Sequence, residues 1–296
     1  MKKIIHILAL VLFLLNCKSH RIQEHNKSII LLDSDLSLFE KWIGVPHTTV
    51  KDLPVGTFQA DIVTKGSPLG LNNDVKNTFT TTTENGETVL NISGEIYGCI
   101  STKANYSNYH LSTLFKWGNK KWEPRINAKR DTGILYHSYG DHGRFWNTWK
   151  TALEYQVQEQ DLGDFIPLDG NTASPKVGGP IVEIRGDFSE VKRFDPNSNI
   201  YSSGSGYIQA ASEHDAPHGK WNLLEIYVIG NDAIHLVNGK IVMVVENAMN
   251  PENGKPLIEG QIQIQSEAAE CYYKNMVLKP IKKFPDFVKK QVRFKL

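Results

Sequence analysis

The chain has 296 residues, of which 40% are hydrophobic and 10% aromatic, and this composition supports a full hydrophobic core. Its 33 basic and 32 acidic side chains almost cancel, and no basic run carries interleaved aromatics. This balance argues against a nucleic-acid partner, because binding to phosphates needs a concentrated basic surface.

The first residues have the pattern of an export signal. The chain begins with MKK, continues as an apolar run over residues 4–15 and reaches Cys17. The run is too short for a membrane-spanning helix, which favours a secretory signal. The segment LLNC, residues 14–17, resembles a bacterial lipobox, which implies lipidation of Cys17; ordinary signal cleavage is the alternative. We expect residues 1–17 to be the signal, residues 18–30 a polar tether and the location periplasmic, with this lipid anchor as the only membrane contact.

Short alternating runs predict β-strands along the rest of the chain. Asn85-Gly86 and Asn238-Gly239 each separate two such runs, which is the signature of a tight hairpin. No long amphipathic helical pattern is present, so we predict an all-β sandwich or barrel, a single domain over residues 31–296. The predicted strands are residues 57–63, 78–83, 89–93, 109–117, 134–137, 152–158, 221–229, 233–237, 240–246, 260–266 and 271–278.

Three segments between the strands are long and irregular, at residues 138–151, 163–182 and 194–218. Long loops in a compact β domain usually contribute to function. The basic and apolar tail, residues 285–296, is expected to pack on the domain.

Cys99 and Cys271 both fall in predicted strands. An exported protein can form a disulfide, but two buried free thiols are equally compatible with the sequence. Neither cysteine has a second Cys or a His at ligand spacing, which argues against a metal site built on cysteine.

A polar strand face is the main functional signal. Glu154, Gln156 and Gln158 alternate with apolar residues and therefore share one face of a predicted strand. A carboxylate followed by two amides suits a groove that holds a hydroxyl-rich ligand. The alternative is a carboxylate on the solvated face of a sheet.

A second polar face occurs near the end of the chain. Glu267 follows Gln265 and two earlier glutamines at alternating positions, so these side chains share a face if the strand continues that far. If this strand lies beside the one with Glu154, the two faces form a concave polar floor.

Two histidines are candidate partners for these carboxylates. His137 ends a predicted strand on the face of Gly133 and Leu135, and it titrates near neutral pH. It is a candidate acid, base or metal ligand, with a hydrogen-bonded structural histidine as the alternative. His214, beside Asp215 in a long loop, is a candidate oriented base, with a solvated loop as the alternative.

Two tryptophans lie in the loop after His137. Trp146 and Trp149 are both suited to stack on a sugar ring through the aromatic face. The alternative is that they anchor their own loop on the core.

Four segments together resemble a known family. These are Gly133-Ile134-Leu135, Glu154-Tyr155-Gln156, the Asn238-Gly239 hairpin and the strand from Gly260 to Met276. In order and spacing they resemble the 3-keto-disaccharide hydrolase domain, formerly DUF1080, which has a concanavalin-like jelly-roll of two antiparallel sheets with long loops over a concave face. The resemblance implies a secreted domain that cleaves glycosides already oxidised to a ketone at C3.

Such a substrate sets the chemistry that the site must supply. A C3 ketone acidifies the hydrogen at C2, so a base can remove it and the enolate can expel the C1 substituent, after which water can add. This needs a base, a group that stabilises the enolate oxygen and an acid for the departing oxygen. A divalent metal ion held by His137 and Glu154 is one candidate stabiliser. The expected catalytic residues are Glu154, His137, Glu267 and His214, and the expected substrate-binding residues are Gln156, Gln158, Trp146 and Gln265.

Two other functions remain open at this stage. The segment from Glu154 to Glu159 resembles the E-x-D-x-x-E strand of concanavalin-like β-glucanases, but Gln156 replaces the middle acid. Without a bulge, Glu154 and Glu159 fall on opposite faces, which weakens a two-carboxylate hydrolysis. The other alternative is a carbohydrate-binding module on the same fold.

Overall fold

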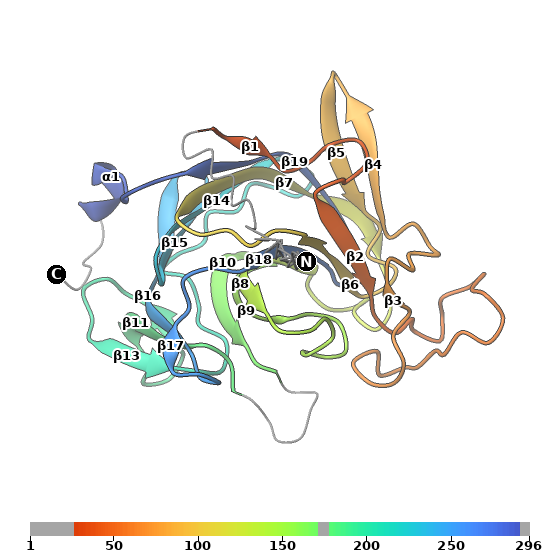
Figure 1. The fold of residues 1–296 in the computed structure, drawn as a ribbon, viewed down its shortest axis with the longest axis horizontal. Helices are drawn as coiled ribbons and strands as arrows, with labels where there is room; N and C mark the ends of the chain where they lie inside the picture. The colour runs from red at the N-terminus through yellow and green to blue at the C-terminus, as the bar shows by residue number, and fades with distance from the viewer. Residues whose placement is uncertain (1–26, 171–177, 291–296) are drawn as a thin grey trace, which may run out of the picture.

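Two antiparallel β-sheets stacked face to face make up the part of the chain that the computed structural model describes, residues 27–170 and 178–290 (Figure 1). The larger sheet curves over the smaller one, and the predicted all-β jelly-roll sandwich is confirmed. The expected signal, Cys17 and most of the expected tether lie outside the described residues.

The larger sheet has the strand order β12-β11-β16-β15-β14-β7-β19-β5-β4, and β1, β13 and β17 pair with β19, β11 and β16. Its strands are β1 (Ile29–Ile30), β4 (Phe79–Glu84), β5 (Glu87–Ile92), β7 (Tyr109–Lys121), β11 (Ile181–Asp187), β12 (Arg193–Phe194), β13 (Ile200–Ser203), β14 (Asn222–Ile229), β15 (Asp232–Val237), β16 (Lys240–Asn250), β17 (Lys255–Pro256) and β19 (Ala269–Pro280).

The smaller sheet has the order β10-β9-β8-β18-β6-β2-β3. Its strands are β2 (Phe39–Ile43), β3 (Gly70–Leu71), β6 (Gly98–Thr102), β8 (Asp131–Tyr139), β9 (Thr151–Gln158), β10 (Asp161–Leu168) and β18 (Gln261–Ser266). The chain changes sheet between β6, β7 and β8 and again between β18 and β19, so strands that are distant in sequence become neighbours. This is how β18 comes to lie directly beside β8.

The strands β6, β8, β9 and β18 of the smaller sheet are buried on both faces. One face packs against the larger sheet, through apolar side chains such as Ile134, Tyr155 and Ile264. The opposite face, here called the outer face, holds a second apolar cluster that includes Leu135, Ala152 and Trp149. Because side chains alternate along a strand, the residues between the core positions of β8, β9 and β18 all belong to this outer face.

Most strand predictions are confirmed, with one clear failure. The residues of the Asn238-Gly239 turn have φ angles of 49° and 76°, as a type I′ hairpin requires. Residues 57–63, in contrast, form no strand: residues 57–60 are irregular and residues 61–63 form a bend and a turn, because the alternation there is weak and turn residues precede it. In the tail, a short helix α1 (Asp286–Lys289) buries Val288 completely. No helix among the described residues is long and apolar enough to cross a membrane.

The two strand cysteines are free and fully buried. Cys99 belongs to the outer-face cluster, whereas Cys271 lies in the core between the sheets. Burial raises the pKa of the Cys99 thiol to about 12, and it also raises the pKa of Cys271. The sequence left open a disulfide or two buried free thiols, and the structure contains the two free thiols.

The loop between β8 and β9 lies on the outer face and covers β6 and β18. Trp149 Nε1 donates a hydrogen bond to the carbonyl of Gly98 at 3.0 Å, and the main-chain N–H of Lys150 donates to Gln263 Oε1 at 3.1 Å. Trp149 is 1% exposed, whereas Trp146 is 37% exposed. Trp149 is therefore the anchor of this loop.

We expect Trp149→Ala to destabilise the protein by about 3–5 kcal/mol, because it removes a large buried side chain and leaves a cavity. Urea unfolding measures the loss. Trp146→Ala is the matched control, and it should cost about 1 kcal/mol or less because that ring is partly solvated. Equal losses in the two variants would contradict the anchoring role.

Candidate functional site

Strand register brings the polar residues of three strands together on the outer face. Asp131 of β8 stands opposite Gln158 of β9, and on its other side it forms a bridge with Glu267, just after β18. Two residues farther along β8, on the same face, Gly133 stands opposite Gln156. The two polar strands were expected to lie side by side, but β8 lies between them, so their polar faces meet across β8.

Gly133 opens the space in which the site forms. A Cβ added to this glycine would lie 2.3 Å from Glu154 Oε1 and 2.5 Å from Gln265 Oε1. Both side chains thus reach over β8 from the strands on either side and meet above the glycine. Any larger residue would occupy the volume that these two oxygens use.

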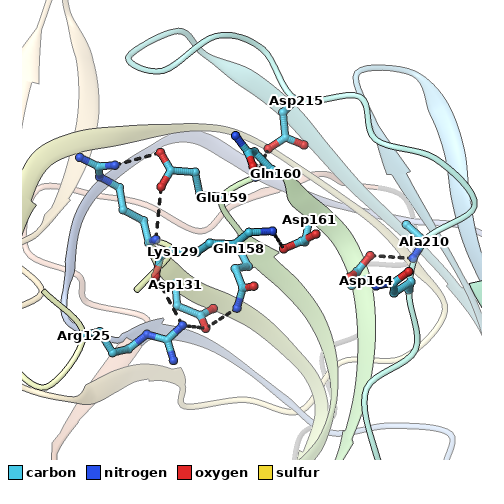
Figure 2. A network of polar contacts seen from close by, with 12 residues as sticks. Arg125, Lys129, Asp131, Gln158, Glu159, Gln160, Asp161, Asp164, Ala210 and Asp215 are labelled. Atoms are coloured by element: carbon cyan, nitrogen blue, oxygen red, sulfur yellow. Dashed lines mark hydrogen bonds and ion pairs between the residues drawn. The ribbon is translucent and has the colours of Figure 1, made fainter. Parts of the chain in front are cut away.

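Three carboxyls and one guanidinium form the charged part of the site. Arg125 Nη2 lies 2.6 Å from Asp131 Oδ2, and Arg125 Nη1 lies 3.4 Å from Glu267 Oε1. Gln158 Nε2 also donates to Asp131 Oδ2, at 2.8 Å (Figure 2). Glu154, Asp131 and Glu267 are each at most 5% exposed. Arg125 therefore pairs with two of the three buried acids, and the described residues include no ion pair to Glu154.

Burial is the largest effect that raises the pKa of all three acids. Burial, followed by the charge of Asp131, raises the pKa of Glu154 well above its usual value, although a hydrogen bond from Gln265 opposes the shift. Burial and Asp131 likewise raise the pKa of Glu267, against the effect of Arg125. The pKa of Asp131 rises to about 6, because burial outweighs Arg125 and Gln158. We infer that Asp131 carries the charge paired with Arg125, while protons are held mainly on the two glutamates.

The site also contains buried polar atoms without a partner. Asp131 Oδ1, Gln156 Oε1 and Gln265 Oε1 have no hydrogen-bond partner, and neither has Arg125 Nε. Leaving such atoms unpaired is costly unless a ligand or water satisfies them. Three unpaired acceptors close together favour a ligand with many hydrogen-bond donors, and the hydroxyl groups of a sugar are such donors.

The prediction that His137 shares the outer face with Gly133 and Leu135 was wrong. A β-bulge interrupts β8 at His137, whose φ is 50°, and Ser138 instead stands opposite Gln261. The His137 ring lies near Tyr136 and against the main chain of Gly230, in the turn between β14 and β15. Burial lowers its pKa to about 4, so the imidazole is neutral at physiological pH. The extra residue reverses the alternation that the prediction relied on.

The candidate metal site does not fit these residues. His137 and Glu154 are not brought together, and within residues 27–170 and 178–290 no group of three or more His, Cys, Asp or Glu is arranged to hold a metal ion. The residues on the outer face therefore give no support to a metal-held enolate.

Three other candidates have partners elsewhere. His214 Nε2 contacts Ser212 Oγ at 2.8 Å, and no described contact joins His214 to Glu154. Trp146 stacks on Phe145 within its own loop. Glu159 lies at the turn after β9 and accepts a hydrogen bond from Arg130 Nη1 at 2.9 Å, so it does not pair with Glu154 across a substrate.

Two residues of the site were not identified from the sequence. Asp131 lies two positions before Gly133, so extending the alternation by one step would have found it. Arg125 follows β7 in a loop, and no local pattern marks it. Only the fold places its guanidinium between Asp131 and Glu267.

We expect Gly133→Ala to abolish ligand binding at this site while leaving the protein folded. The added methyl would displace Glu154 and Gln265, whereas Gly133 has no positive φ that the alanine would strain. Saccharide titration calorimetry and circular dichroism measure the two effects. Gly204→Ala is the control, since its Cβ would meet nothing closer than 3.4 Å. Normal binding by Gly133→Ala would contradict the placement of the site.

The raised pKa of Asp131 predicts a pH-dependent effect on stability. Its usual value is 3.8 and its folded value about 6, so the folded protein holds this proton more tightly. The resulting stabilisation is complete below about pH 4 and is lost as the pH rises through 6. Asp131→Asn should therefore gain on the order of 2 kcal/mol relative to the wild type between about pH 4 and 7.

Urea unfolding at both pH values measures this gain. Asp187→Asn is the control, because Asp187 is exposed and its pKa is lowered rather than raised. A constant difference between Asp131→Asn and the wild type would refute the buried-charge account.

Comparison with known proteins identifies the family. The model of the 3-keto-alpha-glucoside-1,2-lyase-like domain matches residues 39–279. No curated protein matches the chain.

Several solved structures are similar to this chain at low identity. Two "putative glycosyl hydrolase" structures from Parabacteroides distasonis have 18% and 15% identity and TM-scores of 0.40 and 0.45, covering 68% and 86% of this chain and 83% and 100% of theirs. A β-glucanase from Bacillus licheniformis has 9% identity and a TM-score of 0.41, covering 88% of this chain and all of its own. The family model spans most of the described residues, and this chain therefore belongs to the 3-keto-alpha-glucoside-1,2-lyase-like domain family.

Proposed function

We propose that this carbohydrate-active protein cleaves glycosides that carry a ketone at C3, by elimination across the C1–C2 bond. The observation that supports this most directly is the group of unpartnered acceptor oxygens around Gly133, beside the Glu154 carboxyl. The acceptors suit sugar hydroxyls, and the carboxyl supplies a group for proton transfer. Membership of the family supports the class of substrate.

In this proposal Glu154 is the base. The C2–H bond breaks, its proton moves to the ionised Glu154 carboxylate, and the electron pair forms an enolate with the C3 ketone. The enolate then expels the C1 oxygen, which leaves a C1=C2 double bond conjugated with the ketone. A raised pKa makes the ionised form of Glu154 a stronger base, so the rate should increase with pH.

Two further residues have proposed roles. The unpartnered Nε–H of Arg125 is a donor suited to the enolate oxygen, where negative charge develops. Glu267, whose pKa is also raised, holds a proton that it can give to the departing oxygen. Water added later at C1 would yield the free 3-keto sugar.

The acceptor floor also fits a second function. The amides of Gln156, Gln158 and Gln265 could bind a saccharide without any reaction at Glu154, as in a carbohydrate-binding module. Turnover distinguishes the two functions, because a binding module would show saccharide affinity and no cleavage. Cleavage of an unoxidised β-glucan would instead favour a glucanase.

We expect Glu154→Gln to reduce cleavage of a chromogenic 3-keto-α-glucoside by about 100-fold or more, since general-base catalysis contributes roughly that factor. The same variant should have a higher melting temperature above neutral pH, because a neutral amide replaces a destabilised buried acid. Release of the chromophore and thermal unfolding measure the two effects.

Glu159→Gln is the matched control, since Glu159 contacts Arg130 outside the site. It should retain nearly full activity. Activity of Glu154→Gln within a few-fold of the wild type would refute the role of Glu154 as the base.

A further inference from the structure

Tyr97 lies at the edge of the outer-face site, next to Glu267. The last pair between β18 and β6 joins Ser266 to Gly98, so Glu267 and Tyr97 are the next neighbours across the two chain segments. Tyr97 belongs to the outer-face cluster, as the alternation along β6 requires. Asp131 stands on the other side of Glu267. Tyr97, Glu267 and Asp131 therefore form one row across the outer face.

The side chain of Tyr97 extends from this edge toward the charged part of the site. Its ring stacks on Trp149, with ring centroids 5.8 Å apart and planes inclined by 27°. Its hydroxyl oxygen accepts a hydrogen bond from the Arg125 guanidinium, which in turn pairs with Asp131 on β8. Tyr97 is 5% exposed, so these contacts hold the phenol in one place.

The Tyr97 hydroxyl also has a proton to donate. Arg125 occupies a lone pair of the oxygen, and the described residues include no acceptor for the O–H. Burial and the charge of Glu267 raise the pKa of Tyr97, against the effect of Arg125, so the phenol stays protonated near neutral pH. Tyr97 therefore brings a donor to a site whose unpaired buried atoms are mostly acceptors.

Elimination from a 3-keto sugar needs such donors. Removal of the C2 proton places negative charge on the C3 oxygen, and preorganised donors stabilise that charge most effectively away from water. The described site offers two donors for it, the Nε–H of Arg125 and the O–H of Tyr97. Because the two side chains are hydrogen-bonded to each other, both lie close enough to reach one oxygen atom.

We propose that the Tyr97 hydroxyl donates a hydrogen bond to the C3 oxygen of the substrate and is a catalytic residue of the elimination. This inference rests on the proposed function for the ketone and for Glu154 as the base. The C2–H bond breaks, its proton moves to Glu154, and its electron pair forms a C2=C3 bond while the carbonyl π pair moves onto the C3 oxygen. Tyr97 keeps its own proton, and its hydrogen bond strengthens as that oxygen becomes negative.

Tyr97→Phe removes the hydroxyl and keeps the ring that stacks on Trp149. The variant should therefore fold, which circular dichroism and thermal unfolding check. We expect kcat for a chromogenic 3-keto-α-glucoside to fall by about 100-fold, the effect of one lost oxyanion donor, with KM within a few-fold of the wild type. Tyr201→Phe is the matched control and should keep full activity, because Tyr201 is 39% exposed and stacks on Phe188 away from the site.

A second measurement separates the enolate oxygen from the departing oxygen. The 1-deoxy analogue of the 3-keto-glucoside lacks the exocyclic C1 oxygen, so exchange of its C2 hydrogen in heavy water, followed by NMR, reports formation of the enolate alone. Tyr97→Phe should slow this exchange by the same factor as cleavage.

The outcomes distinguish this inference from the proposed function. Slower cleavage with unchanged exchange would assign the Tyr97 hydroxyl to the departing oxygen and overturn its role at C3. Cleavage by Tyr97→Phe within a few-fold of the wild type would also overturn that role, while leaving the proposed function intact. A wild type that neither cleaves the glucoside nor exchanges the C2 hydrogen would overturn the proposed function and this inference together.

Discussion

The burial of three carboxyls around one guanidinium is the interaction on which the candidate site depends. Asp131, Glu154 and Glu267 come from different positions in the sequence; Arg125 pairs with Asp131 and Glu267, and Glu154 has a hydrogen bond from Gln265. Burying like charges is unfavourable for folding. The stability of the surrounding sheet must therefore offset this cost. The same burial raises the pKa of each acid and so provides groups suited to proton transfer.

Two β-bulges decide which side chains face this site. The bulge at His137 removes an imidazole from the outer face and substitutes Ser138. The bulge at Gly163 and Asp164 has the opposite effect, because it adds a buried acid beside Gln156. A single extra residue in a strand thus changes the chemistry of a sheet face without changing the fold.

The outer face is divided into two parts by the loop between β8 and β9. Trp149 attaches this loop to the outer face, and the apolar cluster around it includes Leu135 of β8 and Ala152 of β9. The polar part lies farther along the same strands and has Gly133 at its centre, where the absence of a side chain leaves room for Glu154 and Gln265. Apolar packing and buried polar groups therefore occupy different parts of the same sheet face.

The sequence by itself determined the elements and much of the polar face. Period-two alternation identified the strands with Glu154, Gln156 and Gln158, and the Asn-Gly turns marked two hairpins, since these signals depend only on neighbouring residues. Tertiary structure alone decided that β18 lies beside β8, that Arg125 reaches Asp131, and that His137 turns away. These outcomes depend on strand order, loop path and a bulge, which are set by packing between residues far apart in the chain.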